Sequence, residues 1–201
     1  MDQNPPETIR LKDVIVPPQA NGDRPKAHFS EPRSFAKSPA NRRRNLITTN
    51  LVIALGGRIA RGTSEIYASS MKVQMNNKAV CSPDVVVVNG EPSFADRAYE
   101  ILLNPTVAVE IFSEHDPEND RTRKLNGFLA LSSIKECLLV NEDEMRVEHY
   151  SRQSLKQWVY RIYNERDDVI ALDALSCKIN LSEVYSNVRF GNANVSSKAV
   201  N

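Results

Sequence analysis

The sequence predicts an α/β protein in which a mixed β-sheet is flanked by helices. Segments with apolar residues at helical spacing alternate with short apolar runs that are typical of buried strands. One expected helix is followed by several strands, a second helix and further strands, and a mixed sheet covered by helices is the simplest architecture for this order. A chain of 201 residues with 41% hydrophobic residues can bury one core, so we expect one domain.

The two ends of the chain differ in composition from its middle. Seven of the eleven prolines lie in the first forty residues, and residues 187–201 are rich in Asn and Ser. Such compositions bury too little apolar surface to offset the entropy lost on ordering. We therefore expect a flexible Pro-rich tail at 1–40, a domain at 41–186 and a flexible tail at 187–201.

Charge, cysteine content and hydropathy restrict the class of protein. The chain has 26 Lys and Arg against 25 Asp and Glu, so any contact with DNA requires a local basic patch. Cys81, Cys137 and Cys177 form no CxxC pair and lie in apolar segments, which favours reduced core thiols and a cytoplasmic location. Acidic residues and prolines stand where a signal peptide needs an apolar segment, and no apolar run is long enough to span a bilayer. We expect a cytoplasmic protein without a membrane segment.

Two segments have the features of amphipathic helices. Apolar residues recur at helical spacing between residues 47 and 55, and the pair Gly56-Gly57 is a typical helix end. The second helix is expected from residue 116 to about 131, with Asp116 as its N-cap and a proline at the first helical position. Its apolar residues between 125 and 129 are expected to face the core.

The apolar runs predict a set of strands. They lie at residues 65–68, 72–75, 84–88, 107–112, 137–140, 146–150 and 158–163. The first two are expected to form a short antiparallel pair. Four consecutive valines in 84–88 suit a central strand that is buried on both faces, whereas the last two runs suit half-exposed antiparallel strands.

Two carboxylates are placed where they can meet. Glu110 interrupts the apolar run at 107–112, and Asp84 opens the run at 84–88, so the side chains can approach each other if these strands pair. Isolated buried carboxylates are costly, and hard divalent cations such as Mg²⁺ or Mn²⁺ take oxygen ligands of this type. In a metal-dependent hydrolase a lysine orients the attacking water or stabilises the developing charge, and Lys124 is the candidate.

Each of these residues also has a structural interpretation. Asp84 could shape the entry of the chain into a strand, and Glu110 could be neutralised by an internal Arg or Lys without any metal. Lys124 could pair with Asp120 one helical turn away. These alternatives stay open on the sequence.

Arg42, Arg43 and Arg44 form a short basic run before the first expected helix. One interpretation is contact with a DNA phosphate backbone, and the other is a solvated helix start.

Four spaced motifs occur in a fixed order. They are SPDVVVV at 82–88, NPTVAVEIFS at 104–113, Asp120 with Lys124 and Phe128, and ECLLV at 136–140. Together they resemble the Uma-type family of restriction-endonuclease-like proteins. The resemblance covers residues 38–186 and implies a PD-(D/E)XK nuclease-like fold, a divalent metal, DNA as the substrate and often a homodimer.

The resemblance also implies roles for individual residues. Asp84 and Glu110 would be metal ligands, and both would act in catalysis together with Lys124. Ser113 stands at the usual lysine position on the Glu110 strand, so the lysine of this chain lies on the following helix instead. Ser113 and Asp120 would support the metal ligands and the lysine.

Two positions depart from the family pattern. Arg44 stands about where family members have a histidine, and Ser70 stands where they tend to have an aspartate. The resemblance therefore leads to two hypotheses: a metal-dependent endonuclease that hydrolyses DNA phosphodiester bonds, and a catalytically degenerate interaction or nucleic-acid-binding domain. A third hypothesis, a hydrolase of smaller phosphorylated substrates, rests on the near-neutral net charge of +1.

Overall fold

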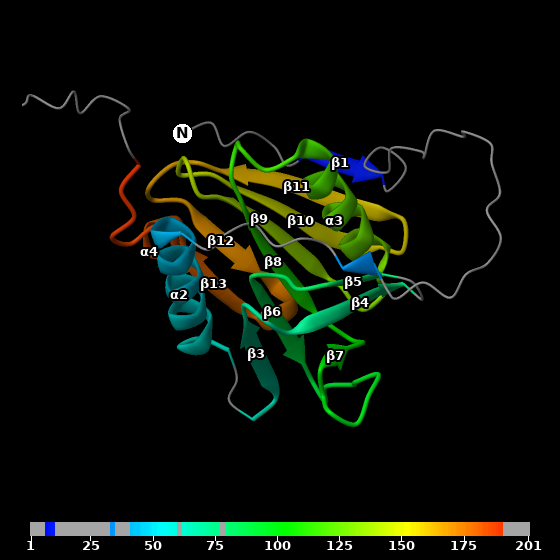
Figure 1. Ribbon diagram of the computed structural model, residues 1–201. Helices are drawn as coiled ribbons and strands as arrows, with labels where there is room; N and C mark the ends of the chain where they lie inside the picture. The colour runs from blue at the N-terminus through cyan, green and yellow to red at the C-terminus, as the bar shows by residue number, and fades with distance from the viewer. Residues whose placement is uncertain (1–6, 11–32, 35–40, 60–61, 77–78, 191–201) are drawn as a thin grey trace, which may run out of the picture.

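A computed structural model describes residues 7–10, 33–34, 41–59, 62–76 and 79–190 (Figure 1). Within these residues a mixed seven-stranded sheet has the order β1-β11-β10-β9-β8-β6-β3. Helix α2 packs on one face of this sheet and helix α3 on the other. The predicted α/β class, a mixed sheet flanked by helices, is confirmed.

The elements have the following bounds. The large sheet consists of β1 (Glu7–Arg10), β3 (Ser64–Ala68), β6 (Val85–Asn89), β8 (Val107–Phe112), β9 (Glu136–Asn141), β10 (Val147–Ser154) and β11 (Gln157–Tyr163). A second sheet has the order β2-β5-β4-β7, with β2 (Arg33–Ser34), β4 (Lys72–Asn76), β5 (Ala79–Cys81) and β7 (Ile101–Leu102). Strands β12 (Val169–Leu172) and β13 (Cys177–Asn180) form an antiparallel pair around the 3-10 helix η1 (Asp173–Leu175). The helices are α2 (Arg42–Gly56), α3 (Glu118–Ala130) and α4 (Leu181–Val184).

Strand β8 occupies an interior position in the large sheet. It pairs antiparallel with β6 and parallel with β9, and all six of its residues are buried. A parallel pair needs a crossover connection, which α3 supplies between β8 and β9. Helix α3 therefore lies over the sheet beside the strand that carries Glu110.

The sheet separates two apolar cores. Alternate residues of β6 and β8 contribute to opposite cores, because side chains alternate along a strand. One core contains the apolar face of α2 with α4, β12 and β13, and the other contains α3 with the second sheet. A Cβ on Gly127 would lie 2.3 Å from Cε of Met75, so the missing side chain permits close packing of α3 on β4.

Several predicted elements are confirmed. Helix α2 ends at Gly56, and Leu125, Phe128 and Leu129 of α3 are buried. The runs at 107–112 and 137–140 form β8 and the middle of β9. Cys81, Cys137 and Cys177 are buried, as expected for core thiols.

Other details of the predicted sheet are wrong. Strands β3 and β4 do not pair with each other, because β3 pairs with β6 whereas β4 pairs with β5 and β7 in the second sheet. Ser69 has a positive φ of 66°, and its N–H donates to the carbonyl of Asp84 (2.8 Å), which directs the chain away from a hairpin. Strand β6 lies next to the edge strand β3 and is not central. Its four valines are nevertheless all buried.

The starts of two elements also differ from expectation. Helix α3 begins at Glu118 with Pro117 as its N-cap, so Asp116 precedes the helix. Strand β10 is buried along its first five residues because it lies between β9 and β11 and packs on both cores. Its expected half-exposed pattern is therefore wrong.

Parts of the predicted tails are described. Strand β1 pairs with β11, and β2 pairs with β5, although both lie in the segment expected to be a tail. Val188 and Phe190 pack on the core that contains α2. The remaining residues of both predicted tails lie outside the described residues, and the domain boundaries stay predictions. In the described part of the chain, no helix is both long and apolar enough to cross a membrane.

Candidate active site

Asp84, just before β6, lies opposite Glu110 in the paired strand β8. Val85 of β6 lies opposite Val109 of the antiparallel strand β8, so the preceding residue, Asp84, comes opposite Glu110. The Asp84 N–H donates to the Val109 carbonyl (3.0 Å), and the Ile111 N–H donates to Asp84 Oδ2 (2.8 Å). The strand pairing and the main chain therefore fix the Asp84 carboxylate beside β8.

Glu110 is a buried carboxylate with one oxygen bonded and the other not. The residue is 4% exposed, and Oε1 accepts a hydrogen bond from Lys124 Nζ (2.5 Å). Oε2 is buried and has no hydrogen-bond partner among the residues that the structure describes. Burial raises the pKa of Glu110 to about 7; the Lys124 ammonium opposes this rise, and the Asp84 charge adds to it.

Lys124 reaches this carboxylate from α3 across the sheet face. The residue is 7% exposed, and burial alone would lower its pKa, but the Glu110 carboxylate outweighs burial and the pKa is raised. Asp120, the alternative partner weighed from the sequence, instead contacts Arg123 (3.6 Å). Lys124 and Glu110 thus form the internal ion pair that was one of the two interpretations of Glu110.

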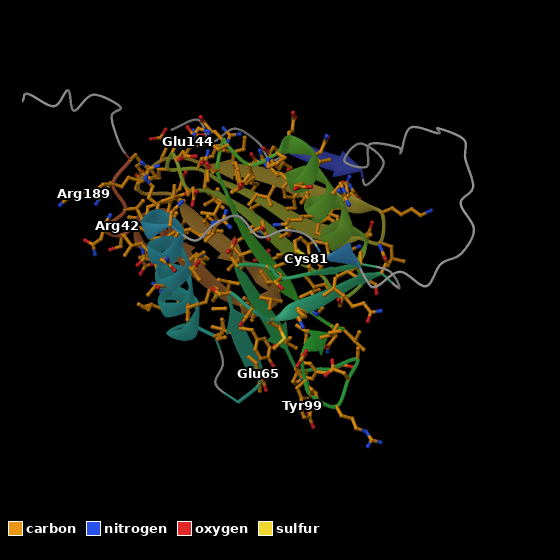
Figure 2. The ribbon with its side chains drawn as sticks, in the orientation of Figure 1. Arg42, Glu65, Cys81, Tyr99, Glu144 and Arg189 are labelled. Atoms are coloured by element: carbon orange, nitrogen blue, oxygen red, sulfur yellow. The ribbon has the colours of Figure 1, made fainter. Side chains whose placement is uncertain are left out.

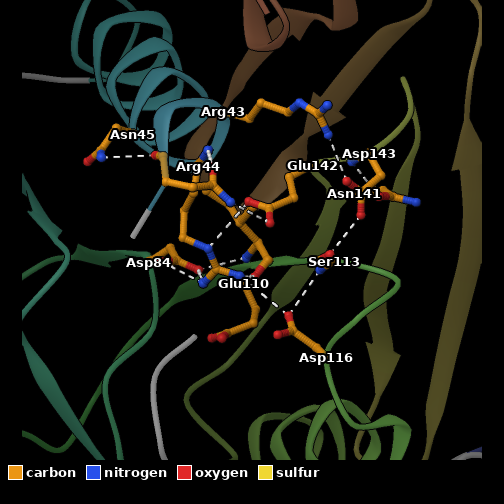
Figure 3. A network of polar contacts seen from close by, with 12 residues as sticks. Arg43, Arg44, Asn45, Asp84, Glu110, Ser113, Asp116, Asn141, Glu142 and Asp143 are labelled. Carbon is orange, nitrogen blue, oxygen red and sulfur yellow. Dashed lines mark hydrogen bonds and ion pairs between the residues drawn. The ribbon is translucent and has the colours of Figure 1, made fainter. Parts of the chain in front are cut away.

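Arg44 is a fourth buried charged group of the site, beside Asp84, Glu110 and Lys124 (Figure 3). It extends from the first turn of α2 and is 2% exposed. Its guanidinium contacts Asp84 Oδ2 (3.2 Å) and donates to the Ile111 carbonyl (2.5 Å). It also lies near Asp116 Oδ2 (3.5 Å) and Glu142 Oε2 (3.6 Å). Arg44 therefore joins α2 to β8 and to the residues that follow β8 and β9.

A ring of polar contacts surrounds Arg44. Ser113 donates from its N–H to Asp116 Oδ2 (3.0 Å) and from its hydroxyl to Asp143 Oδ2 (2.8 Å). Arg43 binds Asp143 Oδ1 (2.8 Å). Burial tends to raise the pKa of Asp143, but the hydrogen bonds from Ser113 and the Glu114 N–H and the charge of Arg43 outweigh it and lower that pKa. Ser113 thus contacts Asp116 and Asp143.

The three arginines at the start of α2 differ in their exposure to solvent. Arg42 is exposed (Figure 2), and Arg43 is half-buried in its contact with Asp143. Arg44 is buried and presents no surface to a phosphate backbone. Ser70, at the position where an aspartate was expected, lies exposed in the turn between β3 and β4.

A small cavity of about 30 Å³ adjoins Glu110 and Lys124. Asp116, Asp120 and Arg121 also line it. A cavity of this size has room for a water-sized ligand beside polar groups that can bind it. Asp120 therefore belongs to the site as one of the residues that line this cavity.

The charges and oxygen atoms of the site fit a divalent cation in part. Four carboxylates surround two cations, which leaves a surplus of two negative charges when all are ionised: Asp84, Glu110, Asp116 and Glu142 against Arg44 and Lys124. No cluster of three His, Cys, Asp or Glu side chains that could hold a metal occurs in the described residues. Mg²⁺ commonly takes one or two protein carboxylates and completes its shell with water and phosphate, so two carboxylates suffice. Glu110 Oε2 is the oxygen that such an ion would satisfy, whereas Asp84 is already bound by Arg44.

The sequence matches the family Uma2, described as "Putative restriction endonuclease", over residues 17–182. The chain belongs to this family. An "Uncharacterized protein sll1609" of Synechocystis sp. (strain ATCC 27184 / PCC 6803 / Kazusa) is 27% identical over 135 residues, which cover 67% of this chain and 76% of that protein. The fold resembles the crystal structure of "a putative nuclease belonging to DUF820" from Anabaena variabilis ATCC 29413, with a TM-score of 0.59. That match covers 75% of this chain and 84% of the other, at 15% identity. The predicted family and its nuclease-like fold are confirmed.

Against the pattern of the Uma2 family, sequence reasoning missed the position of Arg44 in the site. Both interpretations of the basic run, a DNA contact and a solvated helix start, leave Arg44 outside the site, although Arg44 stands about where the family has a histidine. That substitution was the available signal, because a residue that takes the place of a site histidine is expected to face the site. The contacts of Glu142 and Asp116 with Arg44 had no comparable signal in the sequence.

Proposed function

We propose that the protein is a metal-dependent endonuclease that hydrolyses DNA phosphodiester bonds with Mg²⁺ or Mn²⁺. Asp84 and Glu110 would hold the ion, and Lys124 would assist the attacking water. The observation that carries the proposal is the environment of Glu110. This residue lies opposite Asp84 across paired strands and binds Lys124, and one of its buried oxygens has no hydrogen-bond partner in the described structure. Membership of a restriction-endonuclease family supports DNA as the substrate.

The side chains have separate roles in this proposal. A metal ion bound here would polarise the scissile phosphate and lower the pKa of a bound water. The Ile111 N–H orients the Asp84 carboxylate, and Lys124 orients Glu110. The Lys124 ammonium, at the cavity wall, donates a hydrogen bond to the attacking water or to the developing negative charge.

Two further residues support the arrangement. Ser113 holds Asp116 and Asp143 and so fixes the loop between β8 and α3. Asp120 lines the cavity beside Lys124, where it can accept a hydrogen bond from water.

DNA would approach the exposed start of α2. Arg42 is exposed there and Arg43 is half-buried, so these two are the proposed phosphate contacts of the basic run. The homodimer implied by the family is also a proposal, and sedimentation that shows only a 22.6 kDa species would contradict it.

Plasmid nicking tests the catalytic proposal. The wild type is incubated with supercoiled DNA and Mg²⁺ or Mn²⁺, beside Glu110→Gln, an EDTA control and the exposed-residue control Glu165→Gln. We expect nicking by the wild type and by Glu165→Gln, and its loss in Glu110→Gln and in EDTA. Absence of nicking by wild-type protein with either metal would contradict the proposal.

A second candidate function is favoured by one observation. Arg44 neutralises Asp84, and Lys124 neutralises Glu110, without any metal ion. This arrangement suits a catalytically degenerate domain that retains the nuclease fold and binds nucleic acid. DNA binding in EDTA that is unaffected by Glu110→Gln, together with absent nicking, would support this candidate.

A further inference from the structure

The Arg44 guanidinium binds a carboxylate that is one of the two proposed metal ligands, Asp84, and a main-chain carbonyl beside the other. It approaches both carboxylate oxygens of Asp84, at 3.4 and 3.2 Å, and donates to the main-chain carbonyl of Ile111 (2.5 Å). Carboxylate and carbonyl oxygens are also the ligands preferred by Mg²⁺ and Mn²⁺. The Arg44 guanidinium therefore lies among oxygen atoms of the kind that bind divalent metal ions (Figure 3).

Arg44 does not satisfy the whole cluster. Glu110 Oε2 and Glu142 Oε2 are both buried, and neither accepts a hydrogen bond from the residues that the structure describes. Glu142 Oε2 lies in an ion pair with Arg44 Nε at 3.6 Å. Native structures leave few such atoms, and an ion or water commonly accounts for those that remain. The carboxylates around Arg44 and Lys124 also leave surplus negative charge. The cluster thus has both the oxygen atoms and the charge to take a further cation.

We infer that Arg44 and a divalent metal ion compete for Asp84 and the Ile111 carbonyl, so that Arg44 acts as a built-in competitor that weakens metal binding. The inference rests on the proposed function for the identity of the cation. Two cations cannot share these oxygen atoms without strong repulsion in a buried site. The metal ion binds fully only when the guanidinium leaves Asp84.

Arg44 already contacts two other carboxylates, which would remain its partners after such a movement. Glu142 Oε2 lies 3.6 Å from Arg44 Nε, and Asp116 Oδ2 lies 3.5 Å from its terminal nitrogen. Both carboxylates sit on the side of Arg44 away from Asp84 (Figure 3). A guanidinium that turns toward them keeps ionic partners, so it does not become an unpaired buried charge. Arg44 is therefore a regulatory residue of the site rather than a fixed structural contact.

Mn²⁺ alone is the probe that tests this competition, with no DNA and no turnover. Calorimetry measures the Kd of Mn²⁺ for the wild type, Arg44→Gln, Arg44→Gln/Asp84→Asn and Arg58→Gln. Arg58→Gln is the matched control, because it removes the same charge just after the same helix, at a residue that contacts Glu183 and the Ala54 carbonyl and none of the site carboxylates. We expect Arg44→Gln to bind Mn²⁺ about tenfold more tightly or better, equivalent to ~1.4 kcal/mol or more. The double variant should lose this binding, and Arg58→Gln should match the wild type.

Thermal unfolding gives a second readout that does not depend on activity. Without Arg44, the neighbouring carboxylates repel one another, so the Tm of Arg44→Gln in EDTA should fall and Mn²⁺ should restore it. The wild-type Tm should rise less at the same Mn²⁺ concentration. If Arg44→Gln does not fold in EDTA, Arg44→Lys takes its place in the experiment. One ammonium cannot bind Asp84 and the Ile111 carbonyl together as the guanidinium does, so the Kd of Mn²⁺ for Arg44→Lys should lie below the Kd for the wild type.

The outcomes separate the two proposals. An equal Kd in the wild type and in the Arg44 variants overturns the competition and leaves the metal-dependent function standing. Absence of Mn²⁺ binding by every variant overturns both proposals. Tighter binding that survives Asp84→Asn also overturns the competition, because the ion would then lie elsewhere.

Discussion

Replacing Lys124 with Met removes the ammonium that contacts Glu110 and keeps an unbranched side chain at the same buried position of α3. The Glu110 carboxylate, 4% exposed, then loses the cationic partner that lies 2.5 Å from it. Breaking a buried ion pair by removing one partner costs about 3–5 kcal/mol. In a chain of this size 1 kcal/mol corresponds to ~2–4 °C, so the Tm of Lys124→Met should fall by about 6–20 °C.

Removing both charges should cost much less. The double variant Glu110→Leu/Lys124→Met leaves no buried charge in the pair, and its free energy of unfolding should lie within about 1 kcal/mol of the wild type or above it. Urea unfolding in EDTA of the wild type, both single variants and the double variant gives the coupling energy between the two positions. Additive losses in the double variant would refute the reasoning.

The pH dependence of Lys124→Met provides a further check on the same pair. The pKa of Glu110 is already raised above 4.5, to about 7, and it should rise further without the ammonium. The folded state then binds more protons than the unfolded state between the two pKa values, so stability falls as pH rises through that window. The loss of Tm should therefore be larger at pH 8 than at pH 5. A loss that is independent of pH would show that Glu110 is not the group left uncompensated.

Three further predictions concern stability outside the site. The Asn180 N–H and the Arg58 guanidinium lower the pKa of Glu183, so the stabilisation by Glu183 is present at neutral pH and is lost as the pH falls through that lowered pKa. In thermal melts, the difference in Tm between the wild type and Glu183→Gln should therefore shrink below about pH 4. Burial raises the pKa of the Cys137 thiol, so this thiol should react with a disulfide reagent only after unfolding, as mass spectrometry of the labelled peptides can show. Arg152 donates to three carbonyl groups between residues 129 and 134, so Arg152→Ala should lower the free energy of unfolding by about 1–3 kcal/mol, measured with urea. An Arg152→Ala variant as stable as the wild type would contradict that role.

The sequence predicted the parts of the site that depend on local pattern. Glu110 was visible as one carboxylate in an apolar run, and alternation along strands was enough to predict that it could meet Asp84. Lys124 is the candidate lysine because metal-dependent hydrolases use one and because the family resemblance points to the following helix, and its partner stays open on the sequence. The inference on Asp84 and Glu110 needs only strand periodicity and the pairing of two neighbouring strands.

The contacts of Arg44 depend on how distant segments pack. Arg44 lies 40 residues from Asp84 and 67 residues from Ile111, and nothing in a basic run at a helix start indicates that its third member is buried. The pairing of β3 with β6 was missed for a related reason. Two short runs separated by three residues suit a hairpin, and only the rest of the fold draws β4 into the second sheet.

The order of contacts around β8 has a consequence for folding. The β8-α3-β9 unit is continuous in sequence, and the Lys124–Glu110 contact within it closes a loop of only 14 residues. Short loops close with little loss of chain entropy, whereas the contact of Arg44 with Asp116 must close 72 residues. The ion pair can therefore form within a local unit, while the Arg44 contacts require α2 to dock on the assembled sheet. Hydrogen exchange that shows α2 opening before β8 and β9 would reveal a chain in which the carboxylate cluster loses Arg44 each time α2 detaches.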